Sequence, residues 1–159
     1  MAYRGAFSGM GFQPITESST TQKHNLGSRV HAHEDSGKGD AAFVYAKGVA
    51  STVVGDVVTF GSDFATALLG VGAVAGLPCG VAMSANGAGG FGWYAVEGRV
   101  PARANAAVAA GANAYATASP GAIDDAVIAT DLVDGIVFAA AAAGAGLVDV
   151  ILSEPTTTA

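Results

Sequence analysis

The sequence predicts an all-β protein, a compact β-barrel or jelly-roll-like sandwich that carries an extended N-terminal arm. Three observations support this class: short segments rich in branched and aromatic residues, alternation of apolar and polar residues within some of them, and turn residues between them. The chain has 159 residues, and domains commonly contain about 100–200 residues. We therefore expect a single β domain.

The chain divides into three parts. Residues 1–27 show neither helical nor strand periodicity and are rich in Ser, Thr, Gly and Gln, so we expect an extended arm that is ordered only where something else holds it. Residues 28–154 carry the strand patterns and form the single β domain. Residues 155–159 are PTTTA, and we expect a loose C-terminal tail there. The sequence shows no repeat with a fixed period.

The first pair of strands is expected directly after the arm. Residues 28–35, SRVHAHED, place Val30 and Ala32 on one face and Arg29, His31 and His33 on the other, which is the period-2 pattern of a half-buried strand. Residues 41–48, AAFVYAKG, are rich in aromatic and branched residues, which favour strands. The residues between them, 36–40, are SGKGD and are typical of a turn. These patterns predict two strands joined by a short loop.

Two more turns are predicted further along the domain. In residues 53–60, VVGDVVTF, the Gly-Asp pair at 55–56 indicates a turn before a second branched run. In residues 79–98, CGVAMSANGAGGFGWYAVEG, two apolar runs flank the Asn-Gly pair at 86–87. An Asn-Gly pair in this position favours a tight turn, so we predict a β-hairpin.

The glycines of this hairpin also match the spacing G-x-G-x-x-G, at Gly87, Gly89 and Gly92. That motif binds phosphate when a helix follows it, because the helix N-terminus supplies the amide donors. Here the residues after Gly92, WYAVEG, are strand-like, and the acidic residue expected about 20 residues later is missing. We therefore interpret the stretch as the glycine-rich tip of a hairpin.

The last third of the domain, residues 104–154, consists mainly of Ala, Val, Gly and Ile. Alanine alone favours helix, but Ser-Pro-Gly at 119–121 and Asp-Gly at 134–135 interrupt the stretch. In residues 147–152, LVDVIL, apolar residues alternate with Asp149. Short segments with regular turns favour further strands of a barrel or sandwich.

The composition limits the possible partners. Because 51% of the residues are hydrophobic and only 13% are charged, much of the surface must be weakly polar, as in proteins covered by their own copies or by a partner. The net charge of −6 argues against nucleic acid, whose phosphates require clustered Lys and Arg. The uncharged residues 64–85 are long enough to span a membrane, but repeated Gly and Pro interrupt them, so we expect no membrane span.

Few side chains offer chemistry. His31 and His33 lie on one face of a predicted strand, about 7 Å apart at roughly 3.3 Å per residue, and two imidazoles can bind one metal ion. Such a site needs a third ligand, and the remaining histidine, His24, belongs to the arm. Cys79 is the single cysteine, so no disulfide forms within the chain, and we expect a small buried side chain.

Carboxylates and aromatic residues provide two further groups. The aspartates in residues 124–125 and 131–134 lie at turn-like positions without a calcium-binding loop, so we expect them to keep turns hydrated. Phe91, Trp93 and Tyr94 form either a platform that stacks on a sugar or a nucleobase, or the packed core of the hairpin. We assign no catalytic, cofactor-binding or metal-binding residue and predict that the protein is not an enzyme.

Three blocks of the sequence together resemble a known family. They are residues 20–35, TTQKHNLGSRVHAHED, residues 43–60, FVYAKGVASTVVGDVVTF, and residues 80–100, GVAMSANGAGGFGWYAVEGRV. In order and spacing they are similar to the small virion structural proteins of tailed bacteriophages that decorate or cement the capsid. The resemblance covers roughly residues 15–105.

The resemblance implies a function and a set of partners. Proteins of this family have a compact β-barrel or jelly-roll body, an extended N-terminal arm and self-association into dimers or trimers. By this resemblance, the chain binds the major capsid protein on the outer surface of the virion, after assembly in the host cytoplasm. It also implies a homo-oligomer, with a trimer preferred over a dimer, and no catalytic residue.

Two alternative functions remain open from the sequence. A carbohydrate-binding or receptor-binding module of the tail or fibre would use Trp93 and Tyr94 on an exposed face. A metal-dependent jelly-roll enzyme would use His31 and His33 as ligands.

Overall fold

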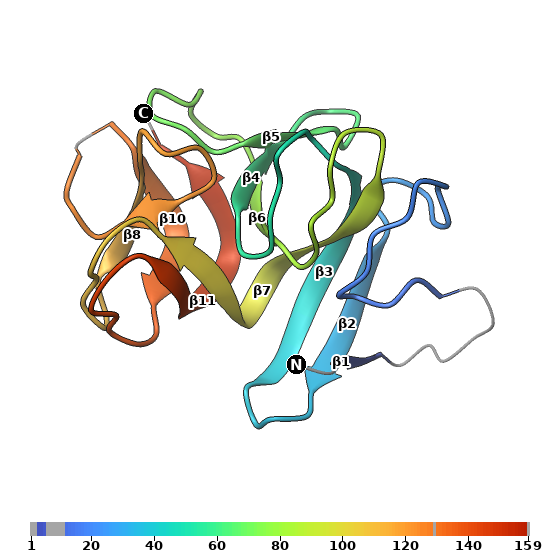
Figure 1. Ribbon diagram of the computed structural model, residues 1–159, viewed down its shortest axis with the longest axis horizontal. Coiled ribbons are helices and arrows are strands. Elements are labelled where there is room, and N and C mark those ends of the chain that lie inside the picture. Colours follow the sequence, from blue (N-terminus) through green and yellow to red (C-terminus); the bar gives the residue numbers. More distant parts are fainter. Residues whose placement is uncertain (1–2, 6–11, 129, 159) are drawn as a thin grey trace.

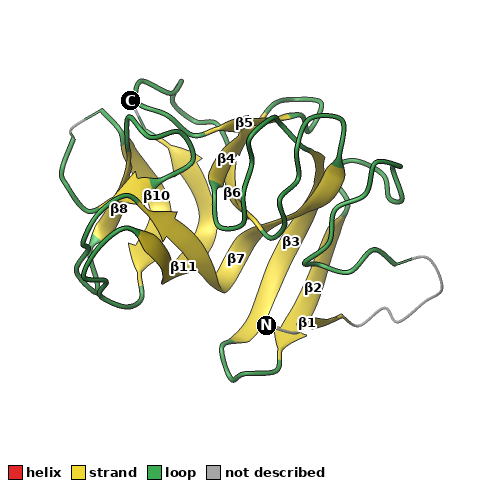
Figure 2. Cartoon of the chain, viewed as in Figure 1, coloured by secondary structure: helices red, strands yellow, loops and turns green. Residues whose placement is uncertain are grey.

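The structure, a computed structural model, describes residues 3–5, 12–128 and 130–158. Within these ranges it consists of strands and loops without a helix (Figure 1 and Figure 2). In this part of the chain eleven strands follow one another: β1 (Tyr3–Gly5), β2 (Arg29–Glu34), β3 (Gly39–Lys47), β4 (Val57–Phe60), β5 (Thr66–Leu68), β6 (Cys79–Ala82), β7 (Phe91–Ala104), β8 (Asn113–Ala116), β9 (Ile123–Asp124), β10 (Leu132–Phe138) and β11 (Gly146–Thr157). The all-β class predicted from the sequence is confirmed.

Five strands close into a small barrel, which we call the first ring. Antiparallel pairs join β3 to β7, β7 to β6, β6 to β4 and β4 to β5. A parallel bridge between Lys47 and Ala65 returns to β3, and the Lys47 amide donates to the Phe64 carbonyl at 3.0 Å. The barrel form predicted from the sequence is therefore present.

A second group of five strands closes in the same manner and forms the second ring. Antiparallel pairs join β7 to β11, β11 to β10, β10 to β8 and β8 to β9. Ala104 of β7 and Ile123 of β9 pair in parallel and complete the ring. The 14 residues of β7 thus belong to both rings, which lie side by side in Figure 1.

The two rings have the same connectivity. If β3 to β7 are replaced in order by β7 to β11, every pairing of the first ring becomes a pairing of the second. Gly55 and Gly111 mark a matching detail, because each stands two residues before the second strand of its ring with a φ of 88° or 81°. The chain thus contains an internal structural repeat, which the sequence does not reveal because different residues fill the two rings.

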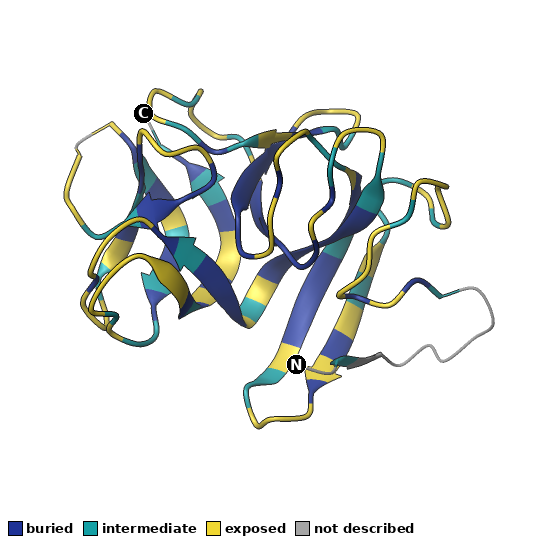
Figure 3. Ribbon diagram, in the orientation of Figure 1, coloured by how far each residue is buried: buried dark blue, intermediate teal, exposed yellow. Residues whose placement is uncertain are grey.

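Buried residues alternate with exposed ones along several strands of the two rings (Figure 3), and the buried side chains fill the ring interiors. The first ring contains two aromatic side chains among small ones: Ala42, Ala46, Val58, Phe60, Ala82, Tyr94 and Val96. The second ring contains mostly alanine and branched residues: Val100, Ala102, Ala104, Ala114, Ala116, Ile123, Ile136, Phe138, Val148, Val150 and Leu152. The alternation predicted for residues 147–152 is confirmed, since Ile151 between two of these residues is exposed.

Residues 12–27 of the expected arm pack on the outer face of β3 and β7. Gln13 is buried there, and its side-chain oxygen accepts a hydrogen bond from the Tyr45 hydroxyl at 2.8 Å. The Trp93 indole donates to the Gln13 carbonyl at 2.9 Å. The β domain itself therefore holds this part of the arm, whereas residues 6–11 lie outside the described residues.

The predicted hairpins are present, but both turns differ. β2 and β3 form the predicted hairpin, but its turn spans residues 35–38, because Gly39 and Asp40 of the predicted turn already belong to β3. β6 and β7 also form the predicted hairpin, but their loop spans residues 83–90 rather than a two-residue turn. The reason is that Asn86 is buried, and its side-chain amide donates to the Tyr94 hydroxyl at 2.9 Å.

Two other local predictions are wrong. The Asp-Gly pair at 134–135 does not end a strand, because Gly135, with a φ of 80°, forms a bulge inside β10. Residues 155–157 are not a loose tail, since they complete β11 and Thr157 is buried. The Thr157 hydroxyl accepts a hydrogen bond from the Leu77 amide at 3.0 Å, which fixes the end of the strand.

The uncharged residues 64–85 form β5, β6 and the loop between these strands. A helix of sufficient length and hydrophobicity to cross a membrane does not occur in the described part of the chain.

Candidate functional site

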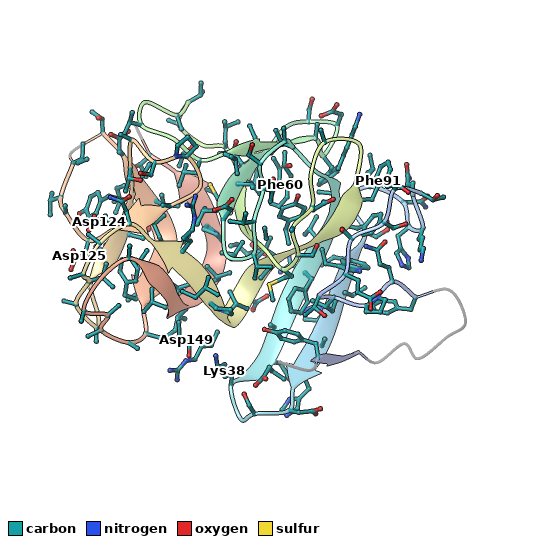
Figure 4. All side chains as sticks on the ribbon, in the orientation of Figure 1. Lys38, Phe60, Phe91, Asp124, Asp125 and Asp149 are labelled. Carbon is teal, nitrogen blue, oxygen red and sulfur yellow. The ribbon has the colours of Figure 1, made fainter. Side chains whose placement is uncertain are left out.

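An apolar pocket opens at one mouth of the first ring. Its volume is about 560 Å³, within the range of roughly 300–1,000 Å³ found for ligand sites. The apolar side chains that line it come from four strands of the sheet and from the loops before β5 and β6: Val44, Phe60, Phe64, Leu77, Pro78, Val96 and Pro155. Phe60, labelled in Figure 4, packs edge-to-face on Tyr94 with ring centres 5.7 Å apart. The interior of the first ring is thus continued by an apolar entrance.

Arg29 and Glu154 line the rim of this pocket, and Glu97 binds Arg29 from beside it. Arg29 of β2 donates to Glu154 of β11 at 2.5 Å and to Glu97 of β7 at 2.9 Å. The hydrogen bond to Glu154 is the main cause that raises the pKa of the Arg29 guanidinium. All three side chains are exposed to solvent, so the ion pairs contribute little to stability. One positive and two negative charges give this rim a net negative charge.

Two residues of the pocket have an unusual backbone conformation. Phe64 has a φ of 56° and Glu154 a φ of 47°, in the left-handed region that disfavours residues with a Cβ. The counterpart of Phe64 in the second ring, two residues before the short strand β9, is Gly121. Glu154 belongs to β11, and the strand that takes the place of β11 in the first ring is β7. In β7 the residue with a positive φ is a glycine, Gly98. Of the described residues, Ser51 is the single other non-glycine residue with a positive φ, and it lies outside the pocket.

Exposed apolar side chains occupy two neighbouring loops beside the second ring. The loop of residues 70–77 contacts the loop of residues 125–131, because the Gly72 amide donates to the Asp131 carboxylate at 2.7 Å. Their exposed apolar residues, which we call the apolar loop patch, are Val71, Val74, Val127 and Ile128, with exposed fractions of 52%, 71%, 78% and 41%. Apolar side chains that remain this accessible mark contact sites.

The two histidines lie on the exposed face of β2, as predicted. Nδ1 of His33 is 2.7 Å from a carboxylate oxygen of Asp40 on β3. His24 lies in the arm, where its Nε2 accepts a hydrogen bond from the Gln13 amide at 3.2 Å, and burial lowers its pKa. No group of three or more His, Cys, Asp or Glu side chains that could hold a metal ion occurs among the described residues.

The structure contradicts an exposed aromatic platform. Trp93 is 1% exposed and Tyr94 is fully buried. Trp93 packs against Phe12 and Tyr45, with ring centres 5.6 and 4.9 Å away, whereas Tyr94 lies inside the first ring. Neither ring is available to stack on a sugar or a base. Core packing is therefore the correct interpretation of these two residues, and a carbohydrate-binding face built on them is ruled out.

Cys79 is buried, as predicted. Its Sγ contacts the Leu77 carbonyl at 3.5 Å, and burial raises the pKa of the thiol from 9.0 to about 12. The thiol therefore stays protonated at neutral pH and is a poor nucleophile.

The glycine motif lies in the loop before β7 and at the start of that strand. β7 begins at Phe91, two residues after Gly89, so the helix N-terminus that a phosphate site requires is missing at this point. A Cβ at Gly92 would lie 3.0 Å from the Ser84 hydroxyl. Close packing therefore accounts for Gly92.

The aspartates bind backbone amides. Asp124 accepts a hydrogen bond from the Asp125 amide, and Asp125 from the Ala109 amide, both at 2.8 Å (Figure 4). Asp131 is buried and joins two loops through Gly72. These carboxylates stabilise loops of the second ring.

The pocket is the feature that sequence analysis missed. Arg29 is 68 residues from Glu97 and 125 residues from Glu154, and only the closure of the sheet brings them together. One feature of the sequence points to the pocket: a phenylalanine, Phe64, stands where the second ring has a glycine. This difference can be recognised only once the structural repeat is known.

Neither a family model, nor a curated protein, nor a solved structure matches this chain. The pocket and the apolar loop patch are therefore interpreted from their own chemistry.

Proposed function

We propose that the protein is a capsid decoration or cement protein of a tailed bacteriophage, which binds the outer surface of the capsid and stabilises the lattice of the major capsid protein. The observation that supports this proposal is the apolar loop patch, which two connected loops present on a body of two closed rings. Closed rings lack long free edges and hold such loops at a fixed spacing. This is the property that a repeated contact on a lattice requires.

Self-association strengthens such a contact. A protein interface of about 1,600 Å² can give an affinity as weak as micromolar. Linking several copies raises the overall affinity by roughly 10²–10⁴, provided that the copies engage the lattice at the same time. We propose a homo-oligomer, with a trimer preferred over a dimer, that adds to the capsid during virion assembly in the host cytoplasm.

The proposal is tested by the copy number of this chain in purified particles of the phage that encodes it. Quantitative mass spectrometry gives the ratio of this chain to the major capsid protein. A cement protein is expected at a ratio near one copy per capsid subunit. A few copies per particle indicate a tail or fibre component, and a chain missing from particles contradicts a virion function altogether.

A pair of variants locates the contact. We expect Val74→Asp combined with Val127→Asp to reduce the copy number at least about tenfold, because charges at the centre of an apolar contact are costly. Ile151→Asp is the matched control, since Ile151 is 51% exposed on β11 outside the patch. Equal copy numbers for the double variant and the wild type would exclude the patch as the contact.

A further inference from the structure

We infer that the pocket at the mouth of the first ring is a binding site for an organic cation, an apolar or aromatic group that ends in a protonated amine or a guanidinium. This inference concerns the isolated chain and does not depend on the proposed capsid function.

The walls of the pocket select an apolar group. Phe60 and Phe64 contribute aromatic rings, and Val44, Val96 and Pro155 contribute aliphatic surface. Small-molecule sites are concave and mostly apolar, with few polar groups that fix the orientation of the ligand. The pocket of about 560 Å³ has this composition, and its charged groups are confined to the rim.

The rim selects a positive charge. Arg29 is neutralised by Glu97 and Glu154, and these hydrogen bonds use only one oxygen of each carboxylate. An anionic ligand would have to compete with two carboxylates for Arg29, whereas a cation is attracted by the net negative charge. The aromatic rings of the wall also favour a cation.

The backbone of the pocket gives an independent indication of function. Phe64 and Glu154 both adopt a positive φ, where glycine avoids steric strain. The second ring uses Gly121 at the position of Phe64, so the connectivity itself accepts glycine there. Strained residues that persist in this way cluster at binding sites. Here the strained backbone carries one aromatic wall and one carboxylate of the same pocket.

The test is a titration of the full chain with two probes of opposite charge, the 2-phenylethylammonium ion and the 3-phenylpropionate ion. Both carry a phenyl ring on a short chain, and amide chemical shifts in two-dimensional NMR spectra report binding. We expect shifts of the amides at residues 61–64, 77, 79, 154 and 156, and binding of the cation at least about fivefold tighter than of the anion. Equal or tighter binding of the anion, or shifts elsewhere in the chain, would overturn the inference.

Three variants sharpen this test. Glu154→Gln is expected to reduce the preference for the cation to about twofold or less, because it removes one rim carboxylate. Glu17→Gln is the matched control, an exposed glutamate of the arm, and is expected to leave the preference unchanged. Val44→Phe fills the pocket and is expected to abolish binding of both probes. The amide spectrum of each variant shows directly whether it is folded.

The cation has two possible sources, a free amine or a basic residue beside an apolar one in a partner polypeptide. The blocked dipeptide acetyl-phenylalanyl-lysine amide distinguishes them. Tighter binding of the dipeptide than of 2-phenylethylammonium identifies a polypeptide source, and weaker binding identifies a free amine. If neither probe binds, the pocket is not a cation site and the inference fails.

Discussion

The two rings of this protein have the same connectivity but differ in what fills them. The first ring contains Phe60 and Tyr94 and continues into an open pocket. The second ring contains mainly alanine, valine and isoleucine. Where the first ring has the strained Phe64, the second has Gly121. The comparison shows that one topology can enclose a packed interior in one ring and open into an apolar pocket in the other.

The second ring also explains the unusual composition. A barrel of few strands has a narrow interior, because its diameter grows with the number of strands. Inward-facing residues must then be small, as Ala102, Ala104, Ala114 and Ala116 are. The alanine-rich last third of the chain is therefore strand sequence whose inward side chains fit a narrow ring.

The rings are joined at a buried charge. Asp56 is fully buried between them, and its carboxylate accepts a hydrogen bond from Arg103 of β7 at 2.6 Å and from the Val53 amide at 2.9 Å. Gly121 packs directly on this carboxylate, where a Cβ would lie 2.7 Å away. Asp56 therefore connects the first ring to two segments of the second.

A large effect is expected from Asp56→Ala, which breaks this connection. Removal of one partner of a buried ion pair costs about 3–5 kcal/mol, and because the Arg103 side chain is 35% exposed while the Val53 amide loses its acceptor, we expect the free energy of unfolding to fall by about 3 kcal/mol in urea titrations. A single transition is expected for the wild type, since β7 passes through both rings. Asp134→Ala is the control at an exposed aspartate, expected within about 0.5 kcal/mol of wild type. Two separate transitions in the wild type would show that the rings unfold independently.

A second pair of variants compares the two interiors directly. Phe138→Ala leaves a cavity in the closed second ring and is expected to cost about 3–5 kcal/mol. Phe60→Ala is expected to cost about 1 kcal/mol less, because Phe60 borders the pocket and water can enter the vacated space. Chemical denaturation of both variants measures the difference. An equal loss, or a larger one for Phe60, contradicts an open first ring.

The comparison also shows which parts of the fold a sequence can predict. β2, β3, β4 and the hairpin of β6 and β7 carry the residue patterns of strands, and these elements were predicted. The strands that close each ring, β5 and β9, were not predicted, because they have only three and two residues. Segments this short show no periodicity. The turn expected at residues 86–87 was wrong because a buried hydrogen bond of Asn86 overrides local turn preference.

The site was harder to predict than the fold. Arg29 was placed correctly on the polar face of its strand, but both of its partners are distant in sequence. The positive φ of Phe64 and of Glu154 cannot be predicted from the sequence, because neither residue type indicates a left-handed backbone conformation. Pockets of this kind are found only after the chain has been closed in space.

A third pair of variants tests this strain. Glu97 and Glu154 both bind Arg29 and both are exposed, but only Glu154 has a positive φ. Glycine within a strand lowers the stability of the folded protein by roughly 0.5–1 kcal/mol. Replacing a strained residue in the left-handed conformation by glycine raises that stability by roughly 1–2 kcal/mol. We therefore expect Glu97→Gly to be less stable than Glu154→Gly by about 1–2 kcal/mol in urea titrations. Equal stabilities would mean that Glu154 is not strained.

The smallest effect is a dependence on pH at Cys79, which lies in the core that both rings share. Burial raises its pKa from 9.0 to about 12, so at pH between these values the unfolded chain loses a proton that the folded chain keeps. The Cys79 thiol therefore makes its full contribution to the free energy of unfolding below pH 9, and this contribution declines as the pH rises towards 12. Each pH unit in this window costs up to about 1.4 kcal/mol.

Comparison of wild type with Cys79→Ala between pH 8 and pH 10 isolates the thiol, because the raised pKa values of Tyr3 and Tyr94 take effect only above their ordinary value of 10.0. The variant starts less stable, since it loses a buried sulfur, but its stability should decline less steeply with pH. A gap of about 1 kcal/mol that narrows towards pH 10 is the expected outcome. Parallel curves would place the thiol in contact with water, and the core between the rings would then be open where the structure has it closed.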